Sequence, residues 1–166
     1  TSIEEFGKNE HVNFVIRIHP AEVKGVAPTM QPMLAEIEKR YPKLPVNVRI
    51  IAPESDISSY TLAKISKAVI IYGTKMGLEM SLMKIPLIIC GTTFSRGKGY
   101  GVDIASKNEY KKIIYVIHYY REQTVDEHER ALRYADYLYF RRMIKLPFTT
   151  NVPHVGKTID FTNFSD

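Results

Sequence analysis

The sequence has little cysteine, no tryptophan and no long apolar run. Its 166 residues include one cysteine, Cys90, which excludes an internal disulfide and a zinc site built on several cysteines. No stretch approaches the roughly 18 uninterrupted apolar residues of a membrane-spanning helix. The opening stretch, TSIEEFGKNE, lacks the basic and then apolar pattern of a signal peptide. We therefore expect a cytoplasmic location, and the lack of an initiating methionine indicates a piece of a longer protein.

Charge of one sign is in only mild excess. The chain has 23 lysines and arginines against 18 acidic residues, a formal net charge of +5. A nucleic-acid-binding protein more often concentrates its positive charge in one stripe, so we expect no nucleic-acid partner. A small phosphorylated ligand accounts for the mild excess equally well.

What the sequence does have is an alternation of apolar runs and helical patterns. Runs rich in valine and isoleucine predict strands, whereas apolar residues three and four positions apart predict helices. The predicted strands lie at residues 12–18, 46–52, 68–73 and 86–91, with a short fifth one in 100–106. The predicted helices lie at residues 27–41, 56–68, 75–85, 108–120 and 125–146.

This alternation predicts an α/β fold with a doubly wound parallel sheet between two layers of helices, α/β/α. The length and the composition, 45% hydrophobic and 25% charged, fit one domain. We expect a single Rossmann-like domain over residues 1–146. Residues 147–166 are rich in Thr, Asn, Gly and Pro and read as a loose C-terminal tail.

The strand-to-helix junction "YGTKMGLEM" has the composition of a phosphate site. Ligands of open α/β sheets bind at the carboxyl ends of strands, where Thr74 offers a hydroxyl and Lys75 a positive charge. Gly77 would keep side-chain bulk away from a ligand. The alternative is structural: Thr74 caps the helix, and Gly77 lets the helix pack on the sheet.

Glu79 follows one helical turn after Lys75. An ion pair between the two is the plain interpretation. The functional one is that the Glu79 carboxylate accepts hydrogen bonds from two ribose hydroxyls.

Two further places offer donors to a phosphate. His19, in "RIHP", ends the first predicted strand and either binds phosphate or is merely solvated. The loop "SRGKGYG" brings Arg96 and Lys98, which either close on an anion or belong to a solvated surface loop.

Other charged residues have weaker functional interpretations. Glu54 and Asp56 could form a catalytic carboxylate pair, but helix capping is the plainer reading. Arg141 and Arg142 suit a helix surface that docks on another part of the protein. No cluster has metal-ligand spacing, so we expect no metal.

Two motifs resemble a known family. The stretch "EMSLMKIPLII" resembles a signature of the C-terminal, donor-binding domain of GT-B glycosyltransferases, with Glu79 as its acidic residue and Pro86 as its proline. "RIHP" resembles the His-Pro motif of bacterial capsule-polysaccharide enzymes, including Kdo-transferase and sialyltransferase families. From His19 to about Tyr110, the order of motifs is similar to that of capsule polysaccharide biosynthesis proteins.

The resemblance implies the Rossmann-like half of a GT-B fold that binds a CMP- or UDP-sugar as substrate, with no cofactor. The implied ribose ligand is Glu79. The residues expected at the donor phosphate are His19, Thr74, Lys75, Gly77, Arg96 and Lys98.

The chain departs from the family in two ways. Lys84 stands where the signature usually has glycine, and the chain holds material for only one of the two GT-B domains. The acceptor site and the usual catalytic base belong to the missing N-terminal domain, so the catalytic residues are unknown. For the full-length enzyme, peripheral membrane association and a homodimer are further expectations.

Two alternatives of other kinds stay open. The first is a non-catalytic nucleotide- or phosphosugar-binding module that regulates or scaffolds a partner. The second is a sugar-nucleotide epimerase, which uses the same two-domain architecture but needs catalytic carboxylates that only Glu54 and Asp56 offer here.

Overall fold

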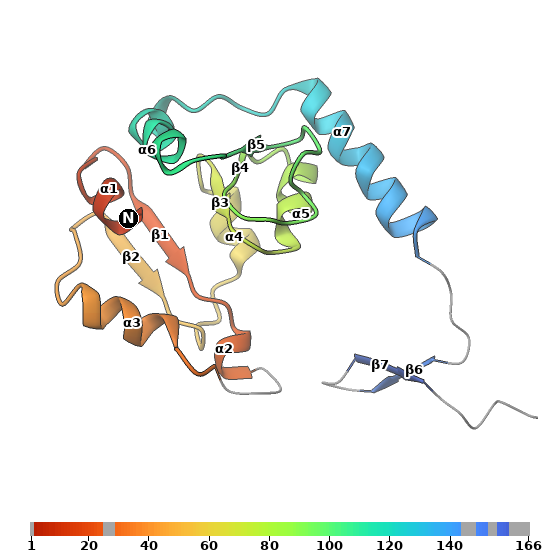
Figure 1. Cartoon of the computed structure of the whole chain (residues 1–166), viewed down its shortest axis with the longest axis horizontal. Helices are drawn as coiled ribbons and strands as arrows, with labels where there is room; N and C mark the ends of the chain where they lie inside the picture. The colour runs from red at the N-terminus through yellow and green to blue at the C-terminus, as the bar shows by residue number, and fades with distance from the viewer. Residues whose placement is uncertain (1, 25–28, 144–148, 153–155, 160–166) are drawn as a thin grey trace, which may run out of the picture.

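The computed structural model describes residues 2–24, 29–143, 149–152 and 156–159. Helices and strands alternate along most of the chain (Figure 1). Within these residues the helices are α1 (Ser2–Gly7), α2 (Ala21–Lys24), α3 (Met33–Arg40), α4 (Ser59–Lys64), α5 (Met76–Leu82), α6 (Lys107–Val116) and α7 (Val125–Asp136), with a 3-10 turn at Ile117–Tyr119 and a π-helical turn at Tyr137–Arg141. The strands are β1 (Phe14–Arg17), β2 (Val48–Ile51), β3 (Val69–Ile71), β4 (Leu87–Ile89), β5 (Val102–Asp103), β6 (Thr149–Val152) and β7 (Gly156–Ile159).

The five predicted strands all form, and all pair in parallel. β1 pairs with β2, placing Phe14 opposite Val48. β3 pairs with β4, which in turn pairs with β5. The prediction of a mixed α/β fold with parallel strands is therefore confirmed. The strands form two small sheets rather than one, because no backbone ladder joins β1 to β3 in the part of the chain that the structure describes.

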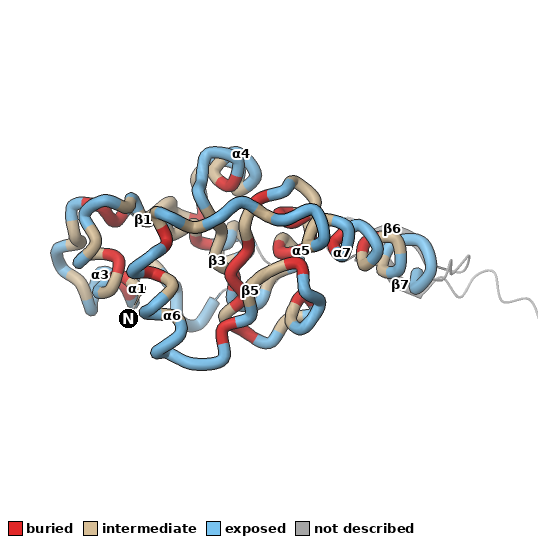
Figure 2. Tube along the Cα trace, turned by 90° about the horizontal axis from the view of Figure 1, so that it is seen from above, coloured by how far each residue is buried: buried red, intermediate tan, exposed pale blue. Residues whose placement is uncertain are grey.

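The two small sheets nevertheless share apolar packing. Ile88 of β4 is buried in a cluster with Phe6 and Ile114, and Phe14 of β1 packs against that cluster. Phe14 also packs against the cluster around Val48 of β2, and its ring stacks on Phe6 with centroids 4.0 Å apart. In the tube of Figure 2, buried residues gather around β3, β5 and α5, and all three residues of β4 are buried.

The sequence did not predict the first helix, α1. It is short, but Ile3 and Phe6 on its inner side are buried. The buried side chain of Asn47, just before β2, donates from Nδ2 to the carbonyl oxygens of Phe6 (2.8 Å), Asn9 (3.0 Å) and Val12 (2.8 Å). These bonds satisfy the carbonyls at the end of α1 and hold it against β2.

The chain beyond residue 124 differs from its prediction. The predicted helix over residues 125–146 is α-helical only to Asp136, continues as the π-helical turn, and has its last residues outside the described part. In the predicted loose tail, β6 and β7 pair antiparallel, with Thr149 opposite Ile159. Both segments carry β-branched residues, which favour extended backbone.

No helix among the described residues is both long enough and apolar enough to cross a membrane.

Aromatic side chains of the C-terminal part are exposed in large measure. Tyr115, Tyr119 and Phe140 are 78%, 82% and 80% exposed, respectively, whereas Tyr110 and Tyr134 are half-buried. Aromatic surface therefore stays uncovered at Tyr115, Tyr119 and Phe140.

Self-association through this surface stays a prediction. Exposed apolar patches of this kind favour contact with another molecule, so we expect a concentration-dependent dimer that Phe140→Ser weakens. Sedimentation velocity over a hundredfold concentration range checks it, and Tyr115→Ser on α6, in the same exposed set, should weaken the dimer as well. A strict monomer at every concentration would contradict the prediction.

A capping box begins α7. The Thr124 hydroxyl accepts the Glu127 backbone N–H (3.2 Å), and the Glu127 carboxylate accepts the Thr124 backbone N–H (2.8 Å). Arg121 adds two hydrogen bonds to the same carboxylate, at 2.7 and 2.5 Å. The Arg121 guanidinium, followed by the Thr124 donors, lowers the pKa of Glu127 from 4.5 to about 2.

Glu127 should make the stability depend on pH. Because its pKa is lower in the folded protein, its contribution is present in full above about pH 4.5 and is lost as the pH falls towards about 2. We expect Glu127→Gln to reduce the free energy of unfolding by about 1–2 kcal/mol at pH 7. The difference from the parent protein should shrink at pH 3 in urea unfolding. An equal difference at both pH values would contradict this assignment.

Candidate functional site

Hydrogen bonds from Arg17 join the carboxyl ends of β1 and β2. Arg17 is the last residue of β1, and its guanidinium donates to the carbonyl oxygens of Ile18 (2.7 Å) and Ala52 (2.7 Å). A third bond reaches the Ser55 carbonyl oxygen, at 3.0 Å. The loop after β2 is thereby held beside the end of β1. Arg17 is not among the site residues predicted from the sequence, although a charge inside the apolar run "FVIRI" is a signal that points to it.

A second contact joins this region to the end of β3. The Ser58 hydroxyl accepts the Tyr60 backbone N–H (3.2 Å) and caps α4. The Tyr60 hydroxyl then donates to Oε2 of Glu79 on α5, at 2.7 Å. The Glu79 carboxylate holds the phenolic proton and so raises the pKa of Tyr60. The loops and helices that follow β1, β2 and β3 are thus connected through Arg17 and through the Tyr60–Glu79 bond.

The partner of Glu79 is therefore tyrosine and not lysine. Within the described ranges, Glu79 makes no ion pair with Lys75, so the simple intrahelical pair is absent. Glu79 is half-buried beside the fully buried Leu78 and Met80. Its second oxygen is the one that stays available to a ligand.

His19 is exposed just beyond β1. Its Nδ1 accepts the Ala21 backbone N–H at 3.0 Å, at the start of the short helix α2. A neutral imidazole that accepts at Nδ1 carries its proton on Nε2. His19 therefore has a structural bond and, at the same time, a ring N–H that can donate to an anion.

Thr74 and Lys75 lie between β3 and α5, as predicted. The Thr74 hydroxyl oxygen accepts the Met76 backbone N–H at 3.3 Å, which leaves its own proton free to be donated. Lys75 is exposed and makes no side-chain cap to the helix. The capping interpretation of Thr74 and the ligand-binding one are compatible.

Gly77 has a packing role. A Cβ at this position would lie 2.5 Å from Cδ1 of Ile71 on β3 and 2.8 Å from the Ser95 hydroxyl oxygen. The space that the glycine opens is filled by these two side chains. The structure thus matches the packing alternative for Gly77.

Arg96 and Lys98 are engaged elsewhere. The Arg96 guanidinium donates to the Ile104 carbonyl oxygen at 2.8 Å and to those of Ile89 and Gly91, both at 3.4 Å. It therefore ties together the carboxyl ends of β4 and β5. Nζ of Lys98 lies 5.2 Å from the ring centroid of Tyr134 on α7. Both cations therefore already have partners among the described residues.

The carboxylates after β2 remain unassigned. Glu54 and Asp56 are exposed, and Ser58 rather than either of them caps α4. No group of three or more metal-ligating side chains occurs in the ranges that the structure describes.

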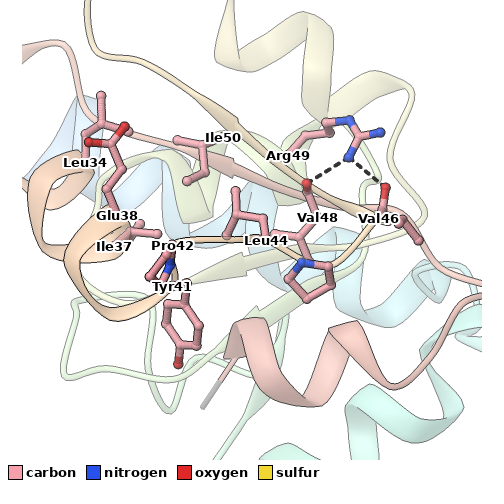
Figure 3. A pocket seen from close by; sticks show the side chains of 11 residues that line it. Leu34, Ile37, Glu38, Tyr41, Pro42, Leu44, Val46, Val48, Arg49 and Ile50 are labelled. Atoms are coloured by element: carbon pink, nitrogen blue, oxygen red, sulfur yellow. Dashed lines mark hydrogen bonds between the residues drawn. The ribbon is translucent and has the colours of Figure 1, made fainter.

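A cavity of about 590 Å³ lies away from these residues, between α3 and the outer edge of β2 (Figure 3). Most of the side chains that line it are apolar, Leu34, Ile37 and Ile50 among them, but polar and apolar atoms contribute about equally to its wall. Arg49 reaches over its rim and donates to the carbonyl oxygens of Val46 (2.6 Å) and Val48 (3.0 Å). None of the predicted ligand-binding residues lines this cavity.

Lys84, in the turn between α5 and β4, has a left-handed backbone with φ of 61°. It is the one residue other than glycine with positive φ among those described. This conformation favours glycine, because a Cβ crowds the following carbonyl.

Comparison of the chain with protein-family models, with curated proteins and with solved structures finds no match.

Proposed function

We propose that this chain is the nucleotide-sugar-binding domain of a glycosyltransferase that acts in bacterial capsule or surface polysaccharide synthesis. The observation that carries the proposal is the set of hydrogen bonds linking the segments after β1, β2 and β3, with a half-buried carboxylate, Glu79, among them. In open α/β sheets, ligands bind outside the carboxyl ends of the strands.

The proposal includes a doubly wound, Rossmann-like sheet. The orders β1-β2 and β3-β4-β5 combine into the order 2-1-3-4-5 if β1 lies beside β3. The packing of Phe14 against both apolar clusters supports this arrangement. In such a sheet the order reverses between β1 and β3, and the ligand binds at that point. His19 follows one of these strands, and Thr74 follows the other.

The backbone at Lys84 supports the family resemblance. The GT-B signature usually has glycine at this position, and Lys84 has the left-handed backbone that glycine adopts most readily. The turn at Lys84 therefore has the backbone conformation that a glycine would adopt, although the residue type differs from the signature.

Each side chain has a role that its contacts allow. Glu79 keeps one carboxylate oxygen for ribose hydroxyls while Tyr60 occupies the other. Nε2–H of His19, the Thr74 hydroxyl and the Lys75 ammonium are donors for the phosphate. Such donors stabilise the negative charge that develops on a departing nucleotide. Since Arg96 and Lys98 are engaged with carbonyls and with Tyr134, they are secondary candidates.

The reaction itself needs a second domain. A GT-B enzyme binds its acceptor across a cleft between two domains, and we propose that the parent enzyme supplies the other half together with the catalytic base. The described residues of this chain bind and orient the donor, and they hold its phosphate.

The isolated chain should therefore bind nucleotides without transferring sugar. We expect saturable binding of CMP or UMP in calorimetric titration, and no glycosyl transfer from CMP- or UDP-sugars to candidate acceptors. Binding of neither nucleotide would overturn the proposed function. Robust transfer by these 166 residues alone would overturn the two-domain reading but not the nucleotide site.

A further inference from the structure

Tyr72 is an exposed aromatic side chain at the carboxyl end of β3. It directly follows Ile71, the last residue of that strand, and is 78% exposed. The described residues give it no hydrogen bond, ion pair or ring contact. Exposed tyrosine rings are common where a protein binds a partner. Because Tyr72 lies beside the candidate site, a ligand bound there can contact its ring.

The position of Tyr72 is nevertheless fixed, by the close approach of β4. A Cβ on Gly91 would lie 1.9 Å from the Tyr72 carbonyl oxygen and 3.1 Å from Cγ of its ring. The backbone of Gly91 therefore supports the base of the tyrosine side chain, and only glycine leaves the room for it. The ladder continues beside this contact, where the Cys90 N–H donates to the Ile71 carbonyl at 2.9 Å.

The surroundings of Tyr72 are open. Gly73, the next residue, has no atom within 4 Å of the place where a Cβ would be. Thr74 follows two residues after Tyr72, a span of about 7 Å at most in extended chain. The ring and the phosphate donors of the junction thus lie within reach of one small ligand.

We propose that Tyr72 is a stacking platform for the base of the bound nucleotide. The inference rests on the proposed function, and it names the ligand class more closely: a nucleoside phosphate recognised partly through its base, rather than a sugar phosphate. An exposed ring whose Cγ lies close to the Gly91 backbone suits stacking, because every base has a π-face. Tyr60 is less suited, since its hydroxyl is held by Glu79.

The test compares variants that differ in the flat ring. Tyr72→Leu keeps the apolar contact with Gly91 but removes the aromatic face, and Tyr72→Ala removes both. Tyr72→Phe keeps the ring. Tyr115→Ala on α6 is the matched control, because Tyr115 is also 78% exposed. Melting curves establish that each variant is folded, and calorimetric titrations use CMP and ribose 5-phosphate.

We expect Tyr72→Leu and Tyr72→Ala each to weaken CMP binding about tenfold, within the range measured for loss of one stacked base. Ribose 5-phosphate should bind these variants as it binds the parent chain, and Tyr72→Phe and Tyr115→Ala should keep the parent affinity for CMP.

Different results would overturn the stacking role of Tyr72 and the proposed nucleotide site. If the parent chain binds CMP and the folded Tyr72→Leu variant binds it equally well, the stacking role is wrong while the nucleotide site stands. An equal loss for CMP and for ribose 5-phosphate would also overturn stacking, because the base would not be involved. If the parent chain binds neither ligand, the proposed function is overturned, and the stacking platform with it.

Discussion

Replacing Gly91 with alanine is expected to destabilise the fold by about 3 kcal/mol or more, at the upper end of the cost of overpacking. A Cβ at this position would lie 1.9 Å from the Tyr72 carbonyl oxygen and 2.7 Å from its carbonyl carbon. These are backbone atoms at the end of a paired strand, so they cannot move aside as a flexible side chain can. Relief of the clash requires β3 and β4 to separate where the Cys90 N–H bonds the Ile71 carbonyl.

Gly73→Ala is the matched control. Gly73 lies 18 positions before Gly91 at the end of the neighbouring strand, yet a Cβ there meets nothing within 4 Å. We expect a change within about 1 kcal/mol, because the main effect is on the entropy of the unfolded chain. Urea unfolding of both variants gives the comparison. Similar midpoints for Gly91→Ala and Gly73→Ala would show that the close approach of the two strands is not as described.

Replacing Glu79 with glutamine should weaken CMP binding by roughly tenfold or more, because charge-assisted hydrogen bonds to ribose would become neutral ones. The fold should change little, since the amide oxygen of glutamine can still accept the Tyr60 hydroxyl. The same change should lower the pKa of Tyr60 towards its ordinary value of 10, because the carboxylate is what raises it.

Two measurements distinguish a role of Glu79 in ligand binding from a role in holding Tyr60. Calorimetry with CMP and cytidine gives the affinities, and NMR titration of labelled tyrosine gives the pKa of Tyr60. Glu54→Gln, at an exposed carboxylate after β2, is the control and should change neither. His19→Ala should weaken CMP but leave cytidine nearly unaffected. Unchanged CMP affinity in Glu79→Gln, together with a shifted Tyr60 pKa, would mean that Glu79 serves only to hold Tyr60.

The strands could be predicted from the sequence, because runs rich in valine and isoleucine favour extended backbone. The helices α3 to α7 were likewise readable from their spacing, apart from their ends. The division into two small sheets was not, because it depends on packing between segments that are far apart in the sequence. Phe14 and Ile70, more than 50 positions apart, both pack against the buried cluster around Ile88, and no local pattern encodes that.

The candidate site was readable only in part. Composition pointed to Glu79, Thr74 and His19, but not to the hydrogen bond from Tyr60, whose partner is 19 residues away. The sequence pattern also placed Arg96 at the phosphate, because a cation in a glycine-rich loop is typical of an anion-binding site. In the structure its guanidinium donates hydrogen bonds to backbone carbonyls. A cation is available to a ligand only if no backbone carbonyl accepts its hydrogen bonds. Tertiary structure determines which carbonyls lack other partners.

Arg49 has a consequence for how this protein meets other chains. The carbonyls of Asn47, just before β2, and of Ile51 accept from the neighbouring β1 segment, so that of Val48 points to the opposite side, where a further strand would pair. The Arg49 guanidinium occupies it, together with the Val46 carbonyl in the preceding turn. An incoming strand would have to displace a charged group in order to bond this end of β2, as on other protected sheet edges. Arg49 therefore guards the start of β2 against pairing with a strand of another chain.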